Sequence, residues 1–246
     1  ADENDMKEPW IWGDVKETDI TPSWVGGDGI FTEGTDDVGN AVLKRVFTHE
    51  NRPYASPFIS IATMMKSAGD AGIAPTVLRI EDGTIIMRKL PATWRNAKLD
   101  ELRDPYVLWS VLEQHRRVHG LHISASDGVM ERDVIEDVFA MRDLYRHTGG
   151  VLPRGVDRML KQLESFISRI DEFHEPAVPC QGDGAASNVL IDPTVRTGDV
   201  AMPMLTGWTV SGVMDPLEEA GSGLSEVGPF CGFPPALISG LGLPPE

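Results

Sequence analysis

The chain has 246 residues and a mass of 26.9 kDa, with 41% apolar and 24% charged residues, which suits one large globular domain or two small ones and excludes wholesale disorder or a fibrous repeat. Acidic residues outnumber basic ones by 38 to 22, and the formal net charge is -16. This excess repels a phosphate backbone and argues against nucleic acid as a partner, so any phosphate site must be local.

The cysteine content and the N-terminal sequence predict the compartment. Cys180 and Cys231 are too few for a disulfide framework or for a thiolate metal site of ordinary ligand count. Residues 1–8 lack the basic start and apolar run of a secretory signal, and no segment has the apolar length needed to cross a bilayer. We expect a soluble cytoplasmic protein with no membrane partner.

Strand-like segments punctuated by glycine dominate the first third of the chain. Gly26, Gly27 and Gly29 separate two short apolar runs, a pattern typical of an antiparallel hairpin. Further strands are expected over residues 41–47, 76–80 and 84–90, and a helix over residues 58–70. Together these segments predict a small lobe of five antiparallel strands and one helix.

The pattern becomes helical after Pro91, with apolar residues at the spacing of a buried helical face. The expected helices cover residues 105–120, 130–147 and 156–173. The fold class predicted is therefore α+β and bilobal. Its parts are an N-terminal extension (1–20), the strand-rich lobe (21–90) and a mainly helical lobe (91–246).

Residues 179–193, PCQGDGAASNVLIDP, carry the clearest chemistry. An aspartate can accept the proton of an attacking hydroxyl while a downstream asparagine reaches a metal bound to nucleotide phosphates, and Asp183 and Asn188 are spaced for these roles. We expect both on a short hairpin. The segment resembles the catalytic loop of the aminoglycoside phosphotransferase and choline kinase superfamily, whose pattern is His-x-Asp, four residues, Asn and an apolar strand.

Three further features carry the same resemblance. The glycines of the first hairpin and Lys44 in VLKRV resemble the nucleotide-covering loop and third-strand lysine of kinase-like folds. Residues 71–78 resemble the family's helix-to-strand joint, and residues 212–227 resemble the segment that follows its metal-binding motif. The resemblance implies a protein-kinase-like fold that would bind Mg-ATP and a small molecule between its lobes, with Lys44 contacting phosphate.

The metal-binding motif of the family is altered. Its catalytic loop usually begins with His, and Gln181 stands there. Its metal-binding aspartate usually precedes Trp or Phe, so aligning Trp208 places Gly207 at the aspartate position. An alternative register makes Asp215 the metal ligand but leaves a longer gap after the asparagine. The first register is preferred because it also places Asp215 and Glu219 on the acidic positions that normally follow.

Two other departures concern the lysine and the end of the chain. Residues 58–69 contain no glutamate, so the acid that usually pairs with the third-strand lysine is not evident. The sequence ends soon after Gly240, where family members commonly continue through more helices. A shortened helical lobe would leave apolar surface over residues 230–243, which predicts a partner protein or a homodimer.

Plainer interpretations exist for the same residues. Asp183 and Asn188 could cap a turn, the glycines could be ordinary turn residues, and Lys44 could be a solvated strand charge.

The remaining polar residues are given no catalytic or metal-binding role. An exposed polar stripe is preferred over a metal site for His115, His119 and His122. Cys180 is expected to be a small buried hydrophobe, and Glu218–Glu219 to be solvated.

Two functions stay open. The preferred hypothesis is a kinase fold that has lost most of its chemistry and acts as a binding or regulatory subunit. The alternative is an active ATP-dependent phosphotransferase for a small hydroxylated molecule, by resemblance an amino alcohol, aminoglycoside or sugar. Asp183 would then be the base, Asn188 with Asp192 or Asp215 would bind the metal, and the acidic surface would suit a cationic substrate.

Overall fold

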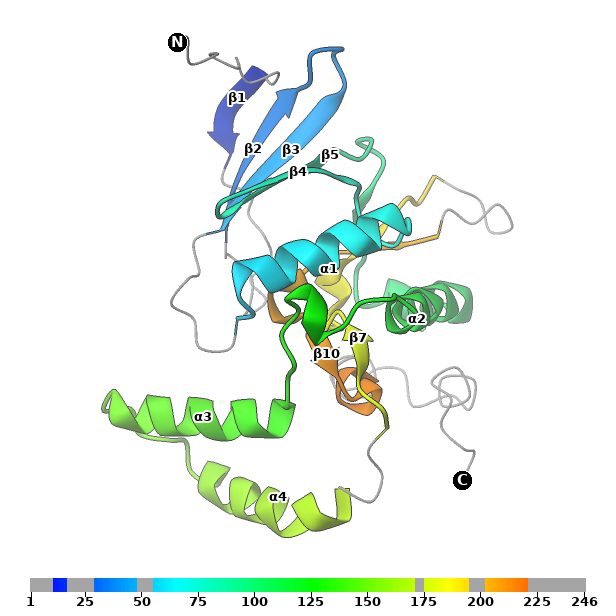
Figure 1. The fold of residues 1–246 in the computed structure, drawn as a ribbon. Helices are drawn as coiled ribbons and strands as arrows, with labels where there is room; N and C mark the ends of the chain where they lie inside the picture. Colours follow the sequence, from blue (N-terminus) through cyan, green and yellow to red (C-terminus); the bar gives the residue numbers. More distant parts are fainter. Residues whose placement is uncertain (1–10, 17–28, 48–54, 171–174, 195–201, 221–246) are drawn as a thin grey trace, which may run out of the picture.

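The computed structural model describes residues 11–16, 29–47, 55–170, 175–194 and 202–220 and has a mixed α+β architecture (Figure 1). The strands are β1 (Ile11–Lys16), β2 (Gly29–Thr35), β3 (Ala41–Phe47), β4 (Val77–Glu81), β5 (Thr84–Arg88), β6 (Arg95–Asn96), β7 (Val178–Cys180), β8 (Val189–Ile191), β9 (Met204–Leu205) and β10 (Gly212–Met214). The α-helices are α1 (Phe58–Asp70), α2 (Pro105–His119), α3 (Val134–His147) and α4 (Val156–Ile170). Within these ranges no helix has both the length and the apolar character needed to traverse a membrane.

The first five strands form one antiparallel sheet in the order β1-β2-β3-β5-β4, at the top of Figure 1. Local chemistry makes the turn between β2 and β3: Asp36 Oδ1 accepts a hydrogen bond from Asn40 N at 2.6 Å, and Gly39 adopts a φ of 84° that favours glycine. The first strand, β1, lies within residues 1–20, where the sequence pattern predicts an extension. It is a strand because it pairs with β2, the next strand along the chain.

Helix α1 connects the sheet to the centre of the molecule, as Figure 1 shows. The helical spacing predicted for residues 58–70 is confirmed, and Ile61, Met64 and Met65 are buried on its inner side. Gly69 permits close packing, because a Cβ there would lie 2.9 Å from the backbone oxygen of Pro75. Helix α1 also contacts β10 and the short 3-10 helix η5 (Trp208–Val210).

Short strands at the centre form two further sheets, β10-β7 and β6-β8-β9. The short hairpin predicted to carry Asp183 and Asn188 is therefore wrong, because β7 pairs with β10 whereas β8 pairs with β6 and β9. Asp183 and Asn188 lie in a connection that crosses from one sheet to the other.

The segment after β5 is fixed beside this connection. Arg95 and Asn96 pair with Ile191 and Leu190 of β8, and the side-chain amide of Asn96 donates to Ser187 O.

Helix α2 has the ends that the sequence predicts. Asp104 Oδ1 accepts a hydrogen bond from Tyr106 N at 2.9 Å at the start, and Gly120 follows the last residue. Helix α3 begins later than expected, because Met130 contacts β10 through its backbone oxygen, which accepts from Val213 N at 2.9 Å. Helices α3 and α4 lie at the lower left of Figure 1.

Candidate functional site

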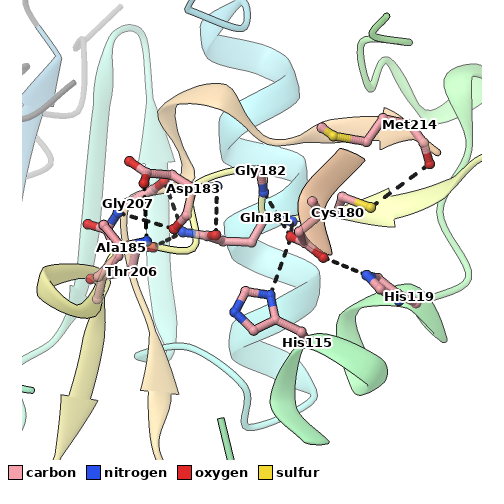
Figure 2. Close-up of polar contacts among 12 residues, drawn as sticks. His115, His119, Cys180, Gln181, Gly182, Asp183, Ala185, Thr206, Gly207 and Met214 are labelled. Carbon is pink, nitrogen blue, oxygen red and sulfur yellow. Dashed lines mark hydrogen bonds and ion pairs between the residues drawn. The ribbon is translucent and has the colours of Figure 1, made fainter. Parts of the chain in front are cut away.

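The connection from β7 to β8 is a compact polar loop at the centre of the molecule (Figure 2). Gln181 is fully buried, and both ends of its side-chain amide are used. Its Oε1 accepts a hydrogen bond from Asp183 N at 2.8 Å, while its Nε2 donates to Thr206 O at 2.6 Å and Gly207 O at 3.2 Å. Where the resemblance expects His, a neutral amide therefore ties the loop to residues 206–207.

The same loop brings Asp183 and Asn188 together. Asn188 ends the 3-10 helix η4 (Ala186–Asn188), and its Nδ2 donates to Asp183 O at 3.3 Å. Asp183 Oδ1 accepts from Ala185 N at 3.3 Å, a turn-forming contact. Both side chains are half-buried, so the geometry accommodates the catalytic and the turn-capping interpretation alike.

Gly207 lies directly against Asn188. Its backbone is left-handed, with φ 71° and ψ 41°, and Thr206 N donates to Asn188 O at 2.8 Å. A Cβ at Gly207 would overlap the side-chain amide of Asn188 and lie 2.5 Å from its Nδ2. The amide thus fills the space that a side chain at residue 207 would need.

The two other acids named as metal ligands have partners of their own. Asp192 Oδ1 accepts from Thr194 Oγ1 at 2.6 Å and Thr194 N at 3.0 Å, and its Oδ2 accepts from Thr93 Oγ1 at 2.9 Å. These hydrogen bonds, those from Thr194 first, lower the pKa of Asp192. Asp192 therefore completes a turn at the end of β8.

Asp215 follows β10, at the end of the β7–β10 pair that is farther from the loop with Asp183. Its neighbour Met214 pairs with Val178, whereas Gly212 pairs with Cys180, from which the loop with Asp183 departs. Asp215 Oδ1 accepts from Leu217 N at 2.9 Å, and its Oδ2 accepts from Glu175 N at 3.2 Å. Asp215 is therefore hydrogen-bonded at the start of the helical residues 216–220.

These placements do not fit a Mg²⁺ ion of the kind that the resemblance implies. Such an ion is held by carboxylates together with substrate phosphates. In the part of the chain that the structure describes, the one group of three or more His, Cys, Asp or Glu ligand atoms lies elsewhere, at His119, Cys180 and Glu219. Asn188 meets the bare backbone of Gly207 instead of a carboxylate.

Comparison with known proteins identifies the fold. No family model and no curated protein matches the sequence, but solved structures do. A choline/ethanolamine kinase family protein from Mesorhizobium loti is 19% identical, with a TM-score of 0.66 over 94% of this chain and 69% of its own. Choline kinase LicA from Streptococcus pneumoniae is 11% identical, with a TM-score of 0.68 over 94% of this chain and 74% of its own.

The chain has the choline kinase fold. Amicoumacin kinase hAmiN, solved in complex with AMP-PNP, Ca²⁺ and Ami, shares it at 10% identity, with a TM-score of 0.57 over 96% of this chain and 71% of its own. The expected protein-kinase-like α+β fold is confirmed at this level. Because one fold hosts many activities, the function must be argued from the site itself.

Lys44, which the resemblance assigns as the third-strand lysine, lies on β3 and pairs with Thr32 and Ile86 across the sheet. Gly29 begins β2, and Gly26 and Gly27 lie outside the described residues.

The face of the sheet that packs against α1 carries Arg45, not Lys44. Phe47 packs edge-on against Phe58 of α1, with ring centroids 5.5 Å apart, and the guanidinium of Arg45 lies 4.2 Å from the Phe47 ring. Since neighbouring strand residues face opposite sides, Lys44 lies on the other face. The single acid of α1, Asp70, pairs with Lys66 of the same helix.

Behind the loop lies a buried carboxylate that the sequence pattern predicts to be solvated. Glu219 is 4% exposed, and its Oε1 accepts from Gln181 N at 2.6 Å and Gly182 N at 2.9 Å. On α2, His119 Nε2 lies 2.5 Å from Glu219 Oε2, and His115 Nδ1 lies 3.3 Å from Oε1 (Figure 2). The solvated Glu219 and the exposed histidine stripe are therefore wrong predictions, although His122 is exposed.

Glu219 interacts electrostatically with the two histidines and with Cys180. Burial alone raises the pKa of Glu219, but the charge of His115 and the contacts with both histidines outweigh it and hold the pKa below its usual range. Cys180 is buried, as predicted, and burial followed by the charge of Glu219 raises the pKa of its thiol. The spacing of His115 and His119 shows in the sequence that they share a helix face, whereas their acidic partner comes from a distant segment.

Proposed function

We propose that this protein is a kinase-fold member of the aminoglycoside phosphotransferase and choline kinase type that has lost most of its phosphotransfer chemistry and acts as a binding or regulatory protein. One observation carries the proposal: the side-chain amide of Asn188 fills the space at Gly207, where the resemblance expects the carboxylate that anchors the nucleotide's metal.

The expected cost of this loss is large. A single group that stabilises transition-state charge is typically worth roughly 10²–10³ in rate, and phosphoryl transfer depends mainly on such stabilisation and on positioning. Two other altered positions should lower the rate further. Gln181 has a neutral side chain that is hydrogen-bonded to the backbone, and α1 has no glutamate to pair with Lys44. Asp183 would then be a base without an activated phosphoryl group.

The proposed ligand is a small molecule bound between two lobes. The strand-rich lobe (21–90) would contribute Gly26, Gly27, Gly29 and Lys44, and the helical lobe (91–246) would contribute Asp183 and Asn188. The net charge of -16 favours a cationic ligand.

An active phosphotransferase is the second candidate, favoured by the retained contact between Asp183 and Asn188. In this function Asp183 would accept the proton of a substrate hydroxyl, and the acceptor would be an amino alcohol, aminoglycoside or sugar. Amicoumacin kinase has the same fold and was solved with AMP-PNP and Ca²⁺, which is a reason to test this second candidate.

A phosphotransfer assay separates the two functions. The full chain is incubated with Mg-ATP and, in turn, choline, ethanolamine, an aminoglycoside and a hexose, beside the matched Asp183→Asn variant. The proposal expects ADP release equal to the protein-free background for both proteins. Acceptor-dependent release by the wild type that Asp183→Asn abolishes would contradict it and establish the second candidate.

The partner surface predicted over residues 230–243 lies outside the described residues. Self-association through it stays a prediction, and sedimentation showing only monomer at high protein concentration would contradict it.

A further inference from the structure

Metal-ligating side chains from three separate segments meet behind the loop (Figure 2). His115 and His119 lie one helical turn apart on α2, Cys180 ends β7, and Glu219 lies in the helical residues 216–220. The ligand atoms of His119, Cys180 and Glu219 all lie within 4.8 Å of one another. The kinase chemistry discussed above gives no role to this group of donors.

The cluster is enclosed by protein. Cys180 is fully buried, and the side chains of Glu219, His115 and His119 are 4%, 13% and 26% exposed. Nδ1 of His115 is buried and lies 3.3 Å from Glu219 Oε1, so this histidine contacts the same carboxylate from one helical turn away.

The donor types and their spacing match zinc. Zn²⁺ prefers imidazole nitrogen, thiolate sulfur and carboxylate oxygen, and a tetrahedral site with bonds of roughly 2.0–2.3 Å separates its ligand atoms by about 3.3–3.8 Å. The donor atoms of His119, Cys180 and Glu219 are close enough to bind one ion once the hydrogen bond between His119 and Glu219 opens.

Glu219 is oriented as a metal ligand would be. Its Oε1 accepts from the backbone of Gln181 and Gly182, which leaves Oε2 directed at His119. Ligating carboxylates are commonly fixed by hydrogen bonds of this kind. An ion bound to Oε2 would therefore be joined through one carboxylate to the loop that carries Asp183.

We propose that His119, Cys180 and Glu219 bind a zinc ion. Three protein ligands leave the fourth position of a tetrahedral ion to a water molecule. Binding converts the Cys180 thiol to a thiolate and releases its proton to water, so the ion replaces a neutral buried thiol with a bonded one. The ion would fix α2 and residues 216–220 to the base of the loop.

Cobalt substitution in the full chain tests the site. The protein is stripped with EDTA, dialysed and titrated with Co²⁺, whose absorption reports a sulfur ligand and tetrahedral geometry. We expect one equivalent of Co²⁺ to give a thiolate-to-cobalt charge-transfer band that one equivalent of Zn²⁺ removes. Absence of the band in the wild type would overturn the proposal without reference to any variant.

Matched variants assign the ligands. Cys180→Ser should abolish the band, and His119→Gln should weaken Zn²⁺ binding by at least about 100-fold, because even groups that only orient a ligand are worth roughly 10–100-fold. Cys231→Ser and His122→Ala should leave the charge-transfer band and the Zn²⁺ affinity unchanged. A band that survives Cys180→Ser, or one that Cys231→Ser removes, would overturn the proposal. If Cys180→Ser fails to fold, shown by circular dichroism, the His119→Gln and Cys231→Ser titrations decide.

Discussion

Gln181 shows how a single residue can hold the loop without taking part in chemistry. Its side-chain amide offers a donor and an acceptor at once, and all three of its hydrogen bonds go to backbone atoms of residues 183, 206 and 207. The sequence reveals that Gln replaces His, but not this clamp, because residues 206–207 are brought to it only by the pairing of β8 with β9.

Replacing Gln181 with Leu should destabilise the protein. The substitution keeps the size of the side chain but leaves three backbone groups without their partner, and a buried unsatisfied polar group costs about 1–3 kcal/mol. We expect the free energy of unfolding, measured by urea denaturation, to fall by about 2–4 kcal/mol. Gln162→Leu, at an exposed position of α4, is the control and should change it by less than about 0.5 kcal/mol. Equal effects of the two substitutions would contradict the clamp.

Gly207 should tolerate a side chain less well than another left-handed glycine. Gly207→Ala must accept a φ of 71° and also displace Asn188, whereas Gly39→Ala must accept a φ of 84° with no atom within 4 Å of the new Cβ. We expect each to cost about 1–3 kcal/mol for the backbone alone. Thermal unfolding should show the larger loss for Gly207→Ala. If Gly39→Ala costs as much or more, Asn188 does not fill this space.

Elements built from local signals could be predicted from the sequence, and those built from distant pairings could not. The ends of α2 follow from Asp104 and Gly120, which are neighbours of the helix in sequence. The predicted hairpin over Asp183 and Asn188 was wrong because the strands on either side pair with segments far along the chain. For the same reason periodicity places His115 and His119 on one helix face but does not name Glu219 as their partner.

The connection between β5 and α2 should be sensitive to acid. Glu101 Oε1 and Oε2 lie 2.6 Å and 2.8 Å from the two terminal nitrogens of Arg95, and this hydrogen-bonded pair lowers the pKa of Glu101 from 4.5 to about 2. A carboxylate with a lowered pKa stabilises the folded state above its unfolded pKa, and this contribution is lost as the pH falls from about 4.5 towards 2.

Glu101→Gln should therefore lower the free energy of unfolding at pH 7, by about 1 kcal/mol or less because the pair is partly exposed to solvent. The difference from the wild type should shrink as denaturation is repeated at lower pH and vanish near pH 2. A difference that stays constant over this range would show that the ion pair is not its cause.

At the scale of the whole molecule, the resemblance carried by residues 183 and 188 indicated the fold, and the solved structures confirm it. The fold alone does not determine the activity, because proteins of different chemistry share one fold. In the proposed function, what separates this chain from a working kinase is the chemistry at Gly207, Asn188 and the acids around them. The sequence register already pointed to Gly207, while the hydrogen-bond partners of Asp192 and Asp215 required the structure.

Calorimetric titration of the full chain with Mg-ATP tests this account most directly. With glycine at residue 207, where the resemblance expects the metal-binding carboxylate, we expect no Mg²⁺-dependent binding tighter than about 1 mM, which corresponds to roughly 4 kcal/mol of binding free energy. Micromolar affinity that disappears when Mg²⁺ is omitted would contradict it.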